Sequence, residues 1–82
     1  MTIEEAIREL EGNESHVRFS RLLVIRKDFF GKARIVGSHH IFKTPWTGDP
    51  RINLQEDKGM AKPYQVRQVL RCLRRLKDRG VS

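Results

Sequence analysis

The chain has 82 residues and a single cysteine, so it can build one small core without an internal disulfide. A domain of this size buries only a little over ~60% of its unfolded surface and is marginally stable. No apolar run approaches the ~20 residues of a membrane helix, and the acidic first residues are unlike a basic signal peptide. We therefore expect a single soluble domain over residues 1–82, and the lone Cys72 indicates a reducing, cytoplasmic location.

The charge is divided unevenly along the chain, whose net charge is +7. Residues 1–15 carry five carboxylates against one arginine, a net charge of −4, whereas the remaining residues carry +11. A small body with such an excess of positive charge attracts polyanions. The composition therefore favours nucleic acid over acidic small molecules as a ligand, although a basic surface that serves only solubility stays open.

Two helices are predicted in the first part of the chain. Thr2 and Glu5 have the spacing of a capping box, and apolar residues with helical spacing follow, which predicts an additional short helix within residues 1–12. Ser20 is the expected N-cap of a second helix, and Gly31 is its expected end. The apolar stripe of that second helix is Leu22, Ile25 and Phe29, flanked by Leu23 and Phe30.

Three strands and a last helix follow. Alternating residues on both sides of a turn at Gly37 and Ser38 predict a hairpin, and residues 51–54 form a short third strand. Pro63 suits the first turn of a helix that runs to about Lys77. The order predicts an α+β two-layer domain, with a three-stranded antiparallel sheet and the helices on one face. The expected buried stripe of the last helix is Val66, Val69, Leu70, Leu73 and Leu76.

The chemistry that the residues allow is that of histidine without a cofactor. The histidines and the cysteine have no familiar zinc spacing, so we expect no metal. Adjacent strand residues point to opposite faces, so His39 and His40 cannot line the same site on a regular strand. A histidine moves protons at neutral pH, and RNA carries its own nucleophile in the 2′-hydroxyl group. A plain surface role for His39 stays open on these residues alone.

Three segments carry a resemblance to a known family. Residues 37–45 read GSHHIFKTP, residues 46–55 read WTGDPRINLQ, and residues 58–70 read KGMAKPYQVRQVL. Over about residues 17–77 the chain resembles the HicA family of mRNA interferase toxins, in which a glycine, a small residue and a histidine open a strand. The combination of this motif with the strand order and the lysine-flanked last helix carries the resemblance.

The resemblance implies a double-stranded-RNA-binding-like fold and a cytoplasmic toxin that needs no metal and is inhibited by a HicB-type antitoxin. It places the catalytic histidine on His39. The rival is His40, because a bulge beside the turn would exchange the two faces.

The sequence leaves three functional hypotheses. The first is an endoribonuclease in which His39 acts on the RNA, and its expected RNA contacts are Ser38, Lys43, Lys58, Lys62 and Arg67. The second is a non-catalytic RNA-binding module of the same fold, and the third is an interaction protein whose basic face docks an acidic partner. Four further polar or aromatic residues have two possible uses each. Trp46 and Tyr64 are expected in the core rather than stacked on bases, and Asn53 and Gln55 face phosphate or solvent.

Overall fold

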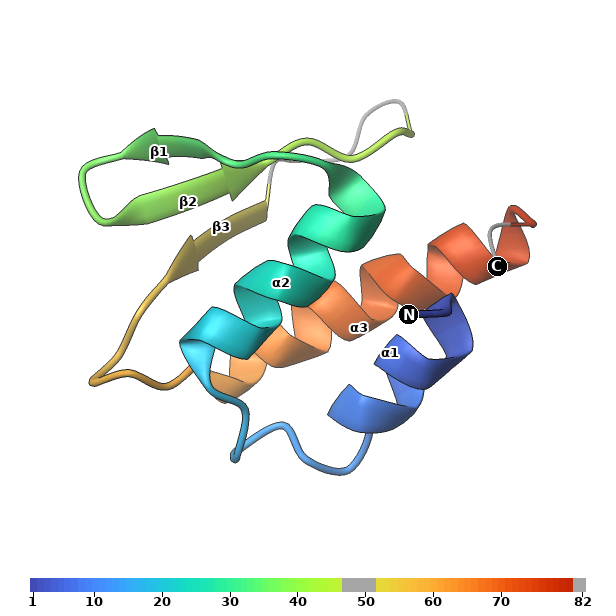
Figure 1. The fold of residues 1–82 in the computed structure, drawn as a ribbon, viewed down its shortest axis with the longest axis horizontal. Coiled ribbons are helices and arrows are strands. Elements are labelled where there is room, and N and C mark those ends of the chain that lie inside the picture. The colour runs from blue at the N-terminus through green and yellow to red at the C-terminus, as the bar shows by residue number, and fades with distance from the viewer. Residues whose placement is uncertain (47–51, 81–82) are drawn as a thin grey trace.

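A computed structural model, which describes residues 1–46 and 52–80, contains three helices and a three-stranded antiparallel sheet (Figure 1). The predicted α+β class and the predicted order of elements are confirmed. The third strand extends to Gln55, and Arg51, which the sequence assigns to it, lies outside the described residues. The elements are α1 (Ile3–Leu10), α2 (Phe19–Phe30), β1 (Arg34–Val36), β2 (His39–Phe42), β3 (Ile52–Gln55) and α3 (Pro63–Asp78).

The start of α1 is the capping box that the sequence predicts. The N–H of Glu5 donates to the Thr2 hydroxyl oxygen at 3.2 Å, and the N–H of Thr2 donates to the Glu5 carboxylate at 3.2 Å. Two otherwise unpaired N–H groups at the helix end are thereby satisfied. The hydrogen bonds from the hydroxyl and the N–H of Thr2 lower the pKa of Glu5 below its ordinary value.

The start of α2 differs from the prediction. The helix begins at Phe19 with Arg18 in the N-cap position, so the assignment of Ser20 as the N-cap is wrong. The Phe19 side chain is buried, and its N–H donates to the Gly59 carbonyl oxygen at 3.1 Å. A long-range contact therefore fixes where the helix starts. The predicted end is confirmed, because Gly31 ends α2 with a φ of 77°, which favours glycine.

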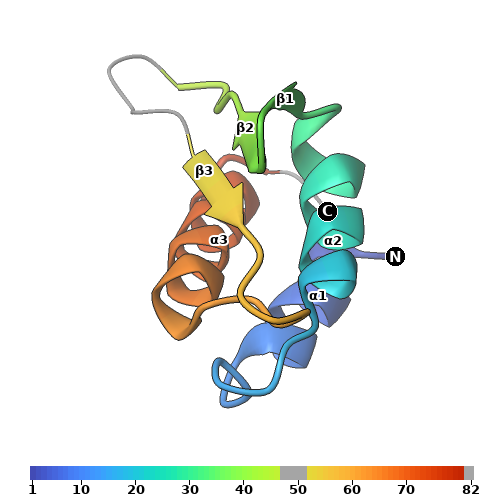
Figure 2. The same ribbon diagram turned by 90° about the vertical axis from the view of Figure 1, so that its left-hand side faces the viewer.

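The sheet has the order β1-β2-β3, and its residues form rows that alternate between its two faces. Phe42 pairs with Ile52 in one row. Leu54 lies two rows away and therefore points to the same face, and all three side chains are buried in the core. Those rows therefore face the helices. Figure 2 shows the helices below the sheet and no helix above it, so the alternate rows form an outward face without a helix.

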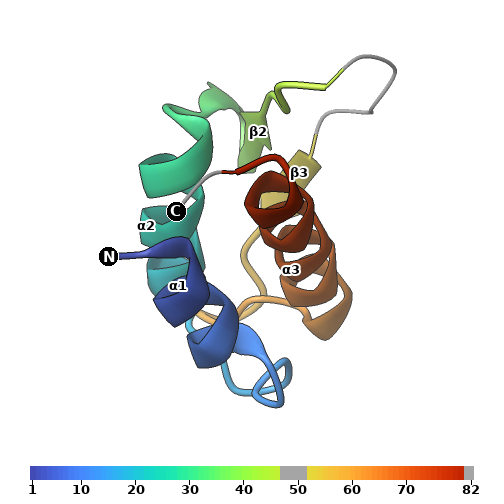
Figure 3. The ribbon, with the colours of Figure 1, turned by 90° about the vertical axis from the view of Figure 1, so that its right-hand side faces the viewer.

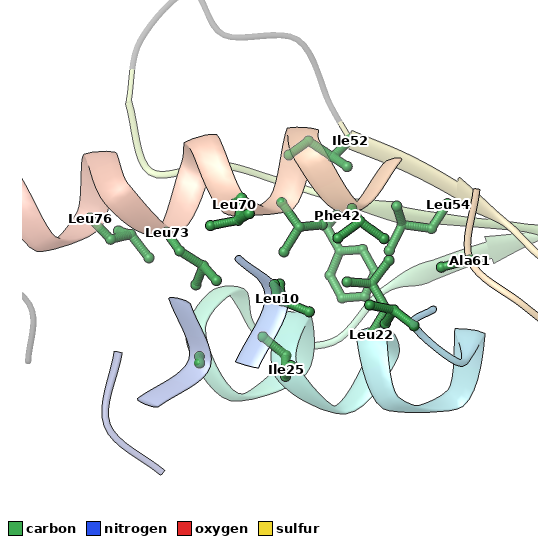
Figure 4. Close-up of a cluster of buried hydrophobic side chains, with 14 of the residues drawn as sticks. Leu10, Leu22, Ile25, Phe42, Ile52, Leu54, Ala61, Leu70, Leu73 and Leu76 are labelled. Atoms are coloured by element: carbon green, nitrogen blue, oxygen red, sulfur yellow. The ribbon is translucent and has the colours of Figure 1, made fainter. Parts of the chain in front are cut away.

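The core lies between the sheet and the three helices. Figure 4 shows Leu73 of α3 pointing toward Leu10 of α1 and Ile25 of α2, and all three are fully buried. One continuous hydrophobic cluster contains residues from every helix and from β2 and β3. The five residues predicted as the buried stripe of α3 are all buried, namely Val66, Val69, Leu70, Leu73 and Leu76.

The additional helix α1 packs on the domain, beside α3 (Figure 3). Its apolar face, Ile3, Ala6 and Leu10, is fully buried in the common core. Its acidic face pairs with basic residues of the other helices rather than facing solvent alone. The ion pairs are Glu9 with Arg21 at 2.6 Å, Glu11 with Arg74, and Glu4 with Lys77 at 4.0 Å.

Arg26 is a core residue that the apolar pattern does not reveal. It is 0% exposed, and its guanidinium carbon lies 3.8 Å from the centre of the Phe30 ring and 4.6 Å from that of Phe42. None of its three guanidinium nitrogens has a hydrogen-bond partner among the residues that the structure describes. Burial lowers the pKa of Arg26 to about 10. The contacts with the two ring faces compensate part of the cost of burying this charge.

Candidate active site

The outward face of the sheet brings together the motif histidine and a set of polar side chains. In one row His39 lies between Val36 and Gln55, and in the neighbouring row Ile41 lies between Arg34 and Asn53. His39, His40 and Ile41 each have one partner on β1 and one on β3, so this part of β2 carries no bulge that would exchange its faces. The prediction that His39 and His40 lie on opposite faces follows directly from this register.

His39 opens β2, immediately after the turn, and is partly buried. Its Nδ1 atom lies 2.9 Å from the Oδ1 atom of Asn53, which comes from the diagonal position on β3. Beside it, the side-chain amide of Gln55 donates to the Ser38 hydroxyl oxygen at 3.3 Å. Two hydrogen bonds from β3 therefore hold the turn and the ring that follows it. Asn53 and Gln55 thus contact the motif residues, a use that the sequence analysis does not include.

His40 lies on the helix side of the sheet. Its ring contacts the Phe19 ring of α2 edge-on, with the centroids 5.3 Å apart, and it is partly buried. It lines a shallow depression with apolar residues that include Leu23 and Ile35, together with Lys27. This aromatic contact gives His40 a packing role, so the geometry favours His39 over its rival as the catalytic residue.

The predicted RNA contacts divide between the two ends of the sheet. Ser38 is part of the turn beside His39, whereas Lys43 follows the far end of β2, four residues or roughly 13 Å along the strand. Lys58 and Lys62 lie on the segment between β3 and α3, where the Ala61 N–H donates to the Val17 carbonyl oxygen at 2.9 Å. That segment lies at the start of α2, the end of the helix that His40 contacts.

Arg67 is exposed on the first turns of α3, outside the strands that form the outward face. The structure therefore groups Ser38 with His39 directly. The four charged residues lie outside the three strands, namely Lys43, Lys58, Lys62 and Arg67.

Arg34 is the cation of the outward face that the sequence analysis missed. It is exposed and lies opposite Ile41, one row from His39, and a guanidinium there suits a phosphate group. The signal that identifies it is the turn length. A turn of two residues pairs 36 with 39, 35 with 40 and 34 with 41, so counting back from the turn places Arg34 on the face of His39.

The two aromatic residues expected in the core have different environments. Trp46 is 6% exposed, as expected, and the guanidinium carbon of Arg75 lies 4.4 Å from its ring centre. Tyr64 is 51% exposed, so the expectation of burial is wrong for this residue. It occupies the second position of α3, beside the buried Gln65 and Val66, which take the inward positions of that turn.

Within residues 1–46 and 52–80, no three histidine, cysteine, aspartate or glutamate side chains are grouped closely enough to hold a metal ion. Among the same residues, no helix has the length and apolar character needed to span a bilayer. The arrangement on the outward face offers one imidazole, a guanidinium, two amides and a hydroxyl around a turn. No protein-family model, curated protein or solved structure matches the chain.

Proposed function

We propose that this protein is a metal-independent endoribonuclease that cleaves mRNA through His39. The observation that carries the proposal is the position of His39 on the helix-free face of the sheet, hydrogen-bonded by Asn53 and with Arg34 on the same face. An RNA strand reaches this face without displacing a helix. The net charge of +7 supports a polyanionic substrate.

The reaction needs only groups of the RNA and one imidazole. Neutral His39 takes the proton of a ribose 2′-hydroxyl, and the 2′-oxygen forms a bond to the adjacent phosphorus as the bond from phosphorus to the 5′-oxygen breaks. The 5′-oxygen leaves with a proton, which protonated His39 or water supplies. The products are a 2′,3′-cyclic phosphate and a 5′-hydroxyl group, so no water is consumed. Arg34 is placed to stabilise charge on the phosphate oxygens.

The biological part of the proposal is a HicA-type toxin in the cytoplasm, with a HicB-type antitoxin as its partner. Its support is the GSHHIFKTP motif at residues 37–45 together with the helix, three-strand, helix order that the family's fold has. The proposed RNA contacts are those named from the sequence, Ser38, Lys43, Lys58, Lys62 and Arg67, with Arg34 added.

The test is cleavage of a structured mRNA in EDTA by three purified proteins: the wild type, His39→Ala and His40→Ala. We expect the wild type to cut and His39→Ala to lose roughly 10²- to 10⁴-fold in rate, the usual contribution of a proton-transferring side chain. His40→Ala is the matched control and keeps its activity if its fold is intact. RNA affinity of His39→Ala, measured by fluorescence anisotropy, stays within tenfold of the wild type, about 1.4 kcal/mol.

Cleavage by the wild type and His39→Ala alike would move the activity to His40 and contradict the proposal. A tenfold or larger loss of affinity in folded His39→Ala would make His39 a binding residue. Growth arrest on expression of the wild type, relieved by His39→Ala, tests the toxin assignment separately.

The second candidate is a non-catalytic RNA-binding module. The observation that favours it is the exposed ring of Tyr64, between Lys62 and Arg67 at the start of α3, where a base can stack beside cationic side chains. This candidate predicts salt-dependent RNA binding without products after long incubation. A Tyr64→Ala variant would then lose RNA affinity, whereas the endoribonuclease proposal assigns Tyr64 no RNA contact.

A further inference from the structure

We propose that Asn53 is a positioning residue, which holds His39 in the tautomer with the proton on Nδ1 and leaves Nε2 as the nitrogen that acts on RNA. The inference deepens the proposed function and rests on it for the catalytic consequence. The tautomer itself does not depend on whether the protein cleaves RNA.

The atoms of the hydrogen bond between His39 and Asn53 determine which side chain donates the proton. Oδ1 of Asn53 is an amide oxygen and can only accept, so at 2.9 Å it requires a proton on Nδ1 of His39. A neutral imidazole carries one proton, so Nε2 then holds the free lone pair. In general, the partner of one ring nitrogen decides the role of the other. Nε2 is therefore the nitrogen that can take the 2′-hydroxyl proton.

The strands explain why Asn53 can hold this ring. His39 lies directly opposite Gln55, and Asn53 is two residues further along β3, on the same face. Diagonal neighbours of an antiparallel pair lie within reach of longer side chains, and the imidazole spans that gap. Gln55 meanwhile donates to Ser38, so it does not compete for the ring. The two amides of β3 thus have separate tasks, one on the turn and one on the histidine.

The bond persists through a proton-transfer cycle. When Nε2 takes a proton, both ring nitrogens become donors, and Nδ1–H still donates to Asn53. The ring therefore keeps its orientation in both charge states. Because the Asn53 side chain is neutral, it orients the ring without adding an opposite charge beside it. Replacing it removes orientation and tautomer selection while leaving the net charge of the site unchanged.

The first measurement is the tautomer of His39 in ¹⁵N-labelled protein, read from long-range ¹H–¹⁵N correlations of the ring at pH 8, where an ordinary histidine is neutral. We expect the wild type to show a protonated Nδ1. Asn53→Ala shifts the ring toward a mixture of both tautomers. Asn53→Asp, which keeps an acceptor oxygen, restores the wild-type pattern. Gln55→Ala is the matched control, because it removes an amide from the same face that bonds Ser38 instead.

The second measurement is the cleavage rate of the same variants. We expect Asn53→Ala to be roughly 10- to 100-fold slower than the wild type, the usual effect of losing a residue that orients a functional histidine, with RNA affinity unchanged. Circular dichroism confirms that each variant is folded.

The outcomes separate the two proposals. A wild-type ring protonated on Nε2, or a tautomer unchanged in Asn53→Ala, would overturn the positioning role whatever the cleavage result. A protonated Nδ1 that depends on Asn53, in a protein that cuts no RNA, would support the positioning role and remove the endoribonuclease function. Normal cleavage by Asn53→Ala despite a changed tautomer would overturn the assignment of Nε2 as the reactive nitrogen.

Discussion

With its side-chain amide turned by 180°, Gln65 pairs with the main chain of Gln55, donating to its carbonyl oxygen at 3.1 Å and accepting from its N–H at 3.2 Å. Gln65 lies in the first turn of α3 and is 1% exposed, whereas Gln55 ends the edge strand β3. The amide thus occupies part of the free edge of the sheet as another strand would. Because Gln55 lies opposite His39, this pair also connects α3 with the row that carries the catalytic candidate.

Gln65→Met is expected to lower the free energy of unfolding by about 1–3 kcal/mol, because both main-chain groups of Gln55 lose a buried partner while the side-chain volume stays similar. Urea denaturation followed by circular dichroism measures the change. Gln68→Met, on the same helix and only half-buried, is the matched control and costs less. Equal stability of the two variants would show that the groups of Gln55 are satisfied without Gln65.

Arg26→Met is expected to raise the free energy of unfolding at pH 7 by about 1–2 kcal/mol, since it replaces a buried guanidinium without hydrogen-bond partners in the described residues by an apolar side chain. Burial lowers the pKa of Arg26 to about 10, so the charged form opposes folding below that pH, and the difference from wild type narrows as the pH rises above 10.

The control for Arg26→Met is Lys27→Met, which removes the same charge from an exposed neighbour. Urea denaturation of both variants at pH 7 compares them directly. A loss of stability in Arg26→Met would mean that the contacts with Phe30 and Phe42 contribute more than the burial of the charge costs.

Glu9→Gln is expected to lower the free energy of unfolding at pH 7 by about 0.5 kcal/mol, a small effect because water reaches both partners of its ion pair with Arg21, whose side chains are 39% and 44% exposed. Hydrogen bonds from Arg21 lower the pKa of Glu9. The stabilisation is therefore present above the ordinary pKa of glutamate and is lost as the pH falls through the lowered value. Thermal unfolding from pH 7 to pH 2 should show the curves of wild type and variant converging at the acidic end. A difference that stays constant with pH would exclude the charge of Glu9 as its source.

Arg34→Ala is expected to weaken RNA binding several-fold and to reduce the slope of log affinity against log salt by about one, the effect of losing one phosphate contact. The matched control is Arg74→Ala, which also removes an exposed arginine. Arg74 is already paired with Glu11, so the salt slope of this variant should stay unchanged. Anisotropy titrations in a His39→Ala background keep the RNA intact. Equal slopes for the two variants would place the RNA away from the outward face.

The helices and the hairpin could be predicted because local spacing determines them. The capping box of Thr2 and the apolar stripe of α3 are short-range patterns, and a two-residue turn fixes the register of β1 against β2. The opposite faces of His39 and His40 follow from the same register.

The remaining features depend on contacts between distant residues. The register of β3 is not fixed by the long connection that precedes it, so the contact of Asn53 with His39 had no local signal. The start of α2 depends on Gly59, forty residues away from Phe19 in sequence. Arg26 was missed because a charged residue within an apolar stripe is ordinarily expected to face solvent.

The ion pairs of α1 make the distribution of charge over the molecule asymmetric. On one side of the molecule, α1 neutralises basic residues through Glu4, Glu9 and Glu11. The outward face of the sheet lies on the other side of α2 and α3 (Figures 1 and 2), and its Arg34 has no acidic helix beside it in the described part of the chain. A body whose positive charge is displaced from its centre carries a dipole moment, and the field of a polyanion exerts a torque on it at a distance. Under the proposed function, this field would favour approaches in which α1 faces away from an RNA, so a chain without those carboxylates would meet RNA in more orientations.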